Sequence, residues 1–178
     1  MKGRELVVGV TGGIAAYKTA ALVSRLVQSG ANVSVVMTEA ATHLVGKATF
    51  AALTGRKVYV GLWEEAQFPL GGHIALADQG ELLCVAPATA NFLAKAANGI
   101  ADDLLSTLYL AFSGPVVVAP AMNTAMWNKP AVQRNVQQLR DDGVQFVGPE
   151  AGWLSCRASG VGRMSDPDAI FAAIAERL

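Results

Sequence analysis

A glycine-rich segment after the first apolar run is the clearest candidate for a ligand-binding loop. The sequence reads Thr11-Gly12-Gly13-Ile14 and runs directly into a stretch with helical spacing of apolar residues. Glycines let a phosphate approach the backbone, and a helix N-terminus offers free N–H groups and the positive end of its dipole. The segment is neither a Walker loop nor a G-x-G-x-x-G loop. It therefore indicates either a mononucleotide phosphate site or a tight turn that binds nothing.

Small polar residues follow two further apolar runs. Thr38 comes directly after one of them, and Thr89 and Asn91 follow the other within Pro-Ala-Thr-Ala-Asn-Phe. Thr89 or Asn91, taken by itself, is more often a helix N-cap than a ligand contact. Ligands of open parallel sheets nevertheless bind at the carboxyl ends of the strands, so these side chains could share a ligand with the glycine loop.

The next apolar run is also followed by a polar residue, Asn123, in the string Pro-Ala-Met-Asn-Thr-Ala-Met-Trp at residues 120–127. The amide of Asn123 can hold a carboxylate without adding charge. On the alternative interpretation, Met122, Met126 and Trp127 only fill the core beside an irregular turn. If the fold is a parallel sheet, three strand ends converge on one crevice.

Short β-branched runs alternate with longer alanine-rich stretches, which is typical of parallel strands connected by helices. Strands are expected at Leu6–Val10, Asn32–Met37, Leu82–Ala86, Val116–Ala119 and Val144–Val147. Helices are expected at Ile14–Gln28, Ala40–Val45, Lys47–Thr54, Ala90–Ala97, Asp103–Phe112, Ala131–Asp142 and Ala169–Leu178. The prediction is an α/β fold: a doubly wound, mostly parallel sheet with helices on both faces, in one domain over residues 1–178. Val60–Gly72 and Pro149–Met164 fit no element and are interpreted as long irregular loops.

Composition excludes several classes of protein. Hydrophobic residues make up 52% of the chain and charged residues 16%, which argues against intrinsic disorder. The 14 basic and 14 acidic residues leave no basic excess for nucleic acid. Two cysteines and two distant histidines predict neither a disulfide framework nor a metal site. The sequence has no apolar stretch long enough to predict a membrane span or a signal peptide. We therefore expect a cytoplasmic protein.

Several strings resemble the flavin-containing cysteine decarboxylases. They are Gly12–Lys18, the His73-Ile74-Ala75-Leu76 segment, Pro87–Asn91 and the specific string at residues 120–127. Gly99–Ser106 and the Cys156-(x)₃-Gly160-x-Gly162-Arg163-Met164 pattern are most similar to the phosphopantothenoylcysteine decarboxylases, as in the N-terminal half of the bacterial bifunctional coenzyme A enzyme. Thr89 replaces a serine of the family's pattern and keeps its hydroxyl, whereas Phe92 replaces a threonine and loses one.

The resemblance implies FMN as cofactor, with its phosphate on Gly12, Gly13 and Ile14. Further contacts to FMN are implied at Thr38, Thr89, Ala90, Asn91, Phe92 and Ala121. It also implies 4′-phosphopantothenoyl-cysteine as substrate and FMN-dependent decarboxylation to 4′-phosphopantetheine in coenzyme A biosynthesis. The protein is expected to assemble as a homotrimer or a multiple of it, such as a dodecamer, because family members place their active sites between subunits.

Residue roles follow from the same resemblance. His73 is expected to be the base for thiol oxidation, Asn123 to hold the substrate carboxylate, and Cys156 to protonate the decarboxylated product. Met126 and Arg163 are expected at the substrate, although Arg163 could instead only brace its glycine-rich loop.

Other functions stay open. A peptidyl-cysteine decarboxylase shares the flavin site and stops at the enethiol, without a need for Cys156. A flavin prenyltransferase, a non-catalytic flavin-fold interaction subunit and an acidic FMN electron carrier fit the sequence less well.

Overall fold

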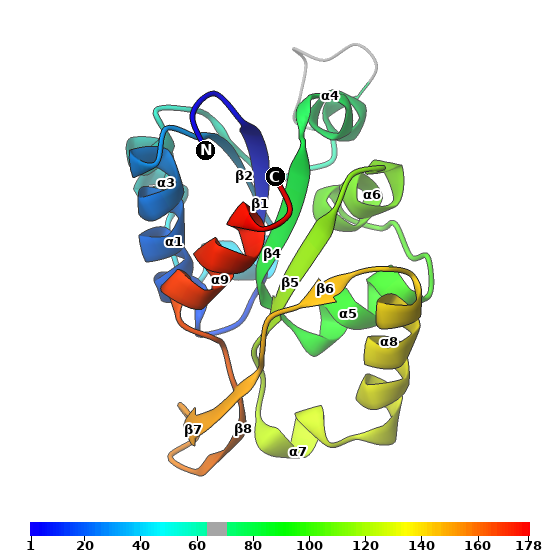
Figure 1. The fold of residues 1–178 in the computed structure, drawn as a ribbon. Helices are drawn as coiled ribbons and strands as arrows, with labels where there is room; N and C mark the ends of the chain where they lie inside the picture. The colour runs from blue at the N-terminus through cyan, green and yellow to red at the C-terminus, as the bar shows by residue number, and fades with distance from the viewer. Residues whose placement is uncertain (64–70) are drawn as a thin grey trace.

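Six parallel strands form the central sheet of the protein (Figure 1). The computed structural model describes residues 1–63 and 71–178. The strands are β1 (Glu5–Val10), β2 (Asn32–Met37), β3 (Val58–Tyr59), β4 (Leu82–Ala88), β5 (Val116–Pro120) and β6 (Gln145–Phe146). Their order is β3-β2-β1-β4-β5-β6, so the chain winds outward in both directions from β1 and β4. The predicted doubly wound α/β fold is confirmed.

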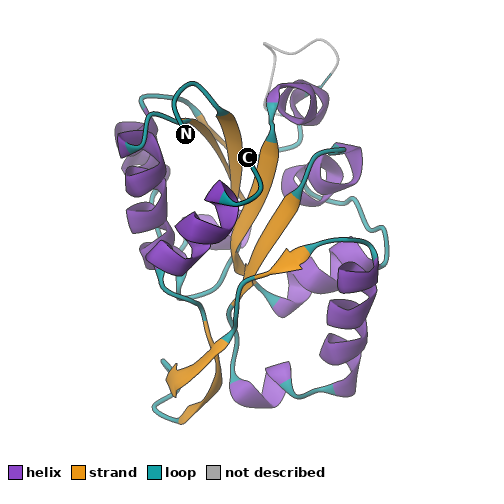
Figure 2. Cartoon of the chain, viewed as in Figure 1, coloured by secondary structure: helices purple, strands orange, loops and turns teal. Residues whose placement is uncertain are grey.

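Helices cover both faces of this sheet (Figure 2). The helices are α1 (Ala16–Gln28), α2 (Glu39–Thr42), α3 (Lys47–Thr54), α4 (Gly72–Gln79), α5 (Ala90–Ala97), α6 (Leu104–Ala111), α7 (Thr124–Trp127), α8 (Pro130–Asp141) and α9 (Pro167–Ala175). Side chains of α1, α3 and α9 share one buried cluster, and those of α4, α5, α6 and α8 share another. Successive residues of each strand point alternately into the two clusters. In β1, for example, Val8 belongs to the first cluster and Val7 to the second. Two-sided burial explains why the strands are continuously apolar.

Pro149–Met164 is not the irregular loop that the sequence predicts. Strands β7 (Glu150–Trp153) and β8 (Ser159–Arg163) pair antiparallel within it and form a hairpin that projects beside α7 (Figure 1). The glycines of this segment hid the strand pattern, because glycine is uncommon in strands and usually marks a close approach of another backbone. The other predicted loop, Val60–Gly72, lies largely outside the described residues; its last residue opens α4.

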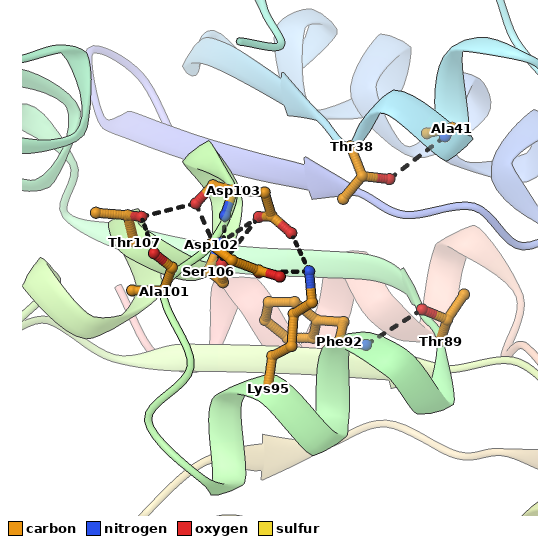
Figure 3. A network of polar contacts seen from close by, with 10 residues as sticks. All are labelled: Thr38, Ala41, Thr89, Phe92, Lys95, Ala101, Asp102, Asp103, Ser106 and Thr107. Atoms are coloured by element: carbon orange, nitrogen blue, oxygen red, sulfur yellow. Dashed lines mark hydrogen bonds and ion pairs between the residues drawn. The ribbon is translucent and has the colours of Figure 1, made fainter. Parts of the chain in front are cut away.

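Polar contacts fix the starts of the helices near the carboxyl ends of β2 and β4 (Figure 3). Asp103 and Ser106 form a capping box at the start of α6. Lys95 of α5 joins Asp102 and Asp103 at 2.6 and 2.7 Å. Burial opposes ionisation of Asp103, but Lys95 and the Ser106 amide outweigh it and lower the pKa of that carboxyl. These contacts connect α5 to α6, which pack on the same face of the sheet.

Among the helices in the described ranges, none combines the length and the apolar character that crossing a membrane requires.

Candidate active site

The loop between β1 and α1 forms an open cradle of backbone N–H groups. Gly13 donates to the carbonyl of Thr11 at 2.8 Å, and Ala16 donates to the carbonyl of Gly13 at 2.9 Å. Within the described ranges, no acceptor faces the amides of Gly12, Ile14 and Ala15. Helix α1 has no side-chain cap and no acidic residue in its first turn. The free amides and the helix dipole therefore make this loop suited to an anion.

Close packing excludes a side chain at Gly12 and leaves little room for one at Gly13. A Cβ on Gly13 would lie 3.3 Å from Pro87 and 3.4 Å from Thr89, and one on Gly12 would lie 2.5 Å from the Cβ of Ala40. Thr11, which the sequence analysis did not single out, holds the loop in place. Its hydroxyl donates to the carbonyl of Pro87 at 2.6 Å and accepts from the amide of Thr89 at 3.1 Å. The ends of β1 and β4 are thereby joined.

Thr38 and Thr89 both act as N-caps. The hydroxyl of Thr38 accepts from the Ala41 amide at 3.3 Å, and that of Thr89 accepts from the Phe92 amide at 3.4 Å (Figure 3). Thr89 also faces the cavity described below, whereas Thr38 does not. The interpretation of Thr89 as a cap is therefore correct, and a ligand contact is compatible with it. Thr38, which was expected at the ligand, caps α2 instead.

Asn123 at the end of β5 has its side-chain amide fixed in one orientation. Its Oδ1 accepts from the amide of Ala125 at 2.7 Å and so caps α7. Its Nδ2 is thereby directed away from the helix and lies 3.2 Å from the Sγ of Cys156. Cys156 is exposed at the tip of the β7–β8 hairpin. The structure thus brings together two residues that lie far apart in the sequence.

Glycines of β8 allow this meeting. The Met122 amide donates to the carbonyl of Gly162 at 3.0 Å, and a Cβ on Gly162 would collide with the Met122 carbonyl. A Cβ on Gly160 would collide with the hydroxyl of Thr124. The Gly-x-Gly spacing therefore lets β8 pack directly on the backbone before α7, as expected where two backbones approach closely.

Arg163 braces the hairpin. Its guanidinium donates to Glu150 across the two strands at 2.8 Å, and this bond lowers the pKa of the Glu150 carboxyl. A Cβ on Gly152 would lie 3.1 Å from Nε of Arg163, so the guanidinium packs flat on β7. The structure favours the brace over a free substrate-binding cation, although the side chain does reach the cavity.

These elements enclose a cavity of about 710 Å³ at the carboxyl ends of β1, β4 and β5. The predicted site residues that line it are Gly12, Gly13, Ile14, Thr89, Ala90, Ala121, Asn123, Met126, Cys156 and Arg163. Lining residues that the sequence analysis did not assign are Ala15, Tyr17, Lys18, Met122, Trp153, Leu154, Ser155, Gly162 and Met164. Tyr17 and Lys18 belong to the first turn of α1, so their position after the glycine loop is a signal that could have identified them.

Three other predicted cofactor contacts lie outside the lining: Thr38, Asn91 and Phe92. The Phe92 ring is buried and packs edge-on against Tyr109, with ring centres 5.9 Å apart. Phe92 therefore belongs to the core, and this packing explains why the position lacks the hydroxyl of the threonine in the family's pattern.

His73 lies far from the cavity. It is the second residue of α4, which packs against α6 near the start of β4, at the opposite end of the molecule from α7 and the hairpin (Figure 1). Its Nδ1 is buried and has no partner among the described residues. A single chain therefore does not bring His73 to Asn123 and Cys156.

The chain is similar to known proteins over nearly its whole length. The chain is 48% identical over 170 residues to the coenzyme A biosynthesis bifunctional protein CoaBC of Bacillus subtilis, and 44% identical over 167 residues to that of Escherichia coli strain K12. The alignments cover 96% and 94% of this chain but only 42% and 41% of those relatives, so the chain spans less than half of their length.

Solved structures extend the comparison over nearly the whole chain. A PPC decarboxylase mutant complexed with pantothenoylaminoethenethiol superposes with a TM-score of 0.87 at 28% identity, covering 98% of both chains. SpaF, an FMN-dependent cysteine decarboxylase, has a TM-score of 0.81 at 39% identity and 97% coverage of both chains. The model of one family, described as Flavoprotein, matches residues 1–178. The chain belongs to the Flavoprotein family.

Proposed function

We propose that this chain is a single FMN-binding decarboxylase domain that converts 4′-phosphopantothenoyl-cysteine to 4′-phosphopantetheine. One observation carries the proposal: the Asn123 amide and the Cys156 thiol meet at 3.2 Å in the cavity that also holds the open amides of the glycine loop. The likeness to PPC decarboxylase and to part of CoaBC supports the choice of substrate. A cytoplasmic location stays a prediction.

The glycine loop fits FMN. Its unpaired amides suit a phosphate, and the close packing at Gly12 and Gly13 leaves little or no room for side chains between the loop and its neighbours. Ile14, Thr89, Ala90 and Ala121 line the adjoining part of the cavity and would contact the ribityl chain or ring. Ile14 is a large apolar side chain that is 58% exposed at the cavity, which supports a contact of this kind.

Decarboxylation of an ordinary cysteine carboxylate needs an electron sink. If the thiol-bearing carbon loses a hydride and the sulfur a proton, the resulting C=S group accepts the electron pair of the breaking C–C bond. CO₂ leaves, and an enethiolate remains. A proton added to carbon regenerates a C=S group, a returned hydride reduces this group to the saturated thiolate, and a proton on sulfur then gives the thiol. Bound FMN supplies the hydride acceptor and donor for this sequence, without net redox change.

The residues of the chain orient the substrate and move protons. Because Oδ1 of Asn123 is committed to capping α7, only its N–H₂ group can point to the substrate carboxylate. A neutral donor of this kind orients the carboxylate without the strong ionic grip that would oppose loss of CO₂. Cys156 is the acid for the enethiolate carbon, since a thiol can give up a proton near neutral pH.

We infer that a second copy of the chain supplies His73. The histidine lies at the far end of its own chain, so its proposed role as base in thiol oxidation requires a site between subunits. Large apolar side chains exposed around the cavity favour such an assembly, and Tyr17 and Trp153 are 64% and 66% exposed. A homotrimer, or a multiple of it, is the proposed form.

One competing function is the decarboxylation of a peptide that ends in cysteine, and the likeness to SpaF, an FMN-dependent cysteine decarboxylase, does not separate it from the proposed one. The test compares kcat/KM of the FMN-loaded protein for 4′-phosphopantothenoyl-cysteine and for such a peptide. We expect turnover of the first and little of the second. Preferred turnover of the peptide would overturn the proposed substrate, and a protein that takes up no FMN would overturn the proposed cofactor.

A further inference from the structure

Arg157 has a backbone conformation that arginine rarely adopts. The amide of Arg157 donates to the carbonyl of Leu154, and the amide of Leu154 donates to the carbonyl of Ala158, both at 2.9 Å. These bonds close a three-residue hairpin loop whose last position is left-handed, and this position usually holds glycine. Arg157, with φ of 62°, is the one non-glycine residue with positive φ in the described ranges. The turn therefore fixes the direction in which its side chain leaves the hairpin.

Arg157 stands at the edge of the cavity. Ser155 and Cys156, the two residues before it, line the cavity, whereas Arg157 itself is exposed and outside the lining. We call the place of Arg157 at this edge the cavity mouth. Because an arginine side chain is long, a group bound by its guanidinium can lie apart from the Sγ of Cys156.

Arg157 differs from the other cationic side chains at this cavity in its ion pairing. Lys18 lies 3.2 Å from Asp166, and Arg163 lies 2.8 Å from Glu150. No carboxylate of the described chain pairs with Arg157. The cavity mouth therefore carries one uncompensated guanidinium, whose planar donors match phosphate oxygens.

We propose that Arg157 binds the phosphate group of the substrate and selects phosphorylated over unphosphorylated pantothenoyl-cysteine. This inference rests on the proposed function. FMN and the substrate each carry a phosphate that the site must bind. The amides of the glycine loop would bind the phosphate of the cofactor, and Arg157 would bind that of the substrate. The phosphate stands at the opposite end of the substrate from the reacting cysteine, so with the thiol at Cys156 a group outside the cavity lining, such as the Arg157 guanidinium, is needed to meet it.

The test uses Arg157→Gly, because glycine adopts the left-handed position without strain and the variant should fold at least as well as the parent. For the FMN-loaded protein, we expect the KM for 4′-phosphopantothenoyl-cysteine to rise about tenfold, with kcat unchanged. The KM for pantothenoyl-cysteine, which lacks the phosphate, should not change. Arg157→Lys should restore part of the loss. Arg134→Gln, which removes an exposed charge on α8, is the matched control and should leave both KM values unchanged.

A KM that stays the same for both substrates, or rises equally for both, would overturn the proposal. A second measurement does not depend on turnover: calorimetric titration of parent and variant with 4′-phosphopantetheine and with pantetheine. The parent should prefer the phosphorylated compound and Arg157→Gly should lose that preference; an equal preference in both proteins would contradict the inference. If the parent decarboxylates neither substrate, the proposed function fails, and this titration still decides the role of Arg157.

Discussion

At the residue scale, Asn123 contacts Cys156 through Nδ2 because the other end of its amide is committed to the helix cap. The bond from the Ala125 amide to Oδ1 leaves Nδ2 as the only group that can face Cys156 and a substrate carboxylate. The sequence predicts both residues through the family strings, but it does not predict their contact, since that contact depends on how the hairpin packs.

Asn123→Asp tests this division of roles. Aspartate caps a helix as well as asparagine does, so the thermal midpoint of unfolding should stay within a few degrees of the parent. A carboxylate has no hydrogen to donate and repels the substrate carboxylate, so kcat/KM should fall by at least about 100-fold. Steady-state kinetics and thermal unfolding of the same preparation measure the two effects. Full activity in a folded variant would show that Asn123 does not hold the carboxylate.

Cys156→Ser tests the proton donor. Serine is close in size but its hydroxyl is a much weaker acid than a thiol, so oxidation and loss of CO₂ should proceed while protonation at carbon fails. We expect a product two hydrogens lighter than 4′-phosphopantetheine by mass spectrometry, with the flavin left reduced. Ordinary 4′-phosphopantetheine at the parental rate would exclude Cys156 as the acid and strengthen the peptide alternative.

Other site residues could not be predicted individually. Thr11 is a buried threonine whose two hydrogen bonds join β1 to β4, and nothing in its sequence context distinguishes it from a strand residue. Trp153 reaches the cavity only because an antiparallel hairpin forms where the sequence indicated a loop. In both cases tertiary contacts decide the role of the residue.

At the element scale, the order of strands and helices was predictable because buried parallel strands produce continuous apolar runs. Strand β2 has the predicted bounds, and β1 and β4 differ from them by one or two residues. The short edge strand β3 and the helix α7 were missed, since two and four residues are too few to show a period. Helix α4, which begins at the end of the predicted loop Val60–Gly72, was missed as well.

Gly13→Asp tests the anion site at the start of α1. A carboxylate here repels a phosphate, and its Cβ would crowd Pro87 and Thr89 at 3.3 and 3.4 Å. We expect a folded protein that has lost FMN, seen as loss of the oxidised-flavin absorbance. The matched control is Gly46→Asp at the N-cap of α3, where a Cβ meets nothing within 4 Å and φ is −69°. The control should stay yellow; a yellow Gly13→Asp protein would place the phosphate elsewhere.

At the scale of the whole molecule, the separation of His73 from the cavity leads to a prediction about assembly. His73→Asn and Asn123→Asp should each be inactive and should each retain FMN. In trimers mixed at random, one copy can supply Asn123 and its neighbour His73, so the mixture should recover about one quarter of the parental activity. Activity after co-refolding of the two variants, compared with each variant refolded alone, measures the recovery. No recovery in mixed trimers, or a monomeric mass by light scattering, would contradict a shared site.

The whole account depends on decarboxylation without net oxidation of the product. The most direct measurement is mass spectrometry of the product that the FMN-loaded protein makes from 4′-phosphopantothenoyl-cysteine, with the flavin spectrum recorded at the end of the reaction. We predict a product that has lost one CO₂ and matches 4′-phosphopantetheine in its hydrogen content, with the flavin again oxidised. Recovery of unchanged substrate, or of only the enethiol two hydrogens lighter, would contradict the account.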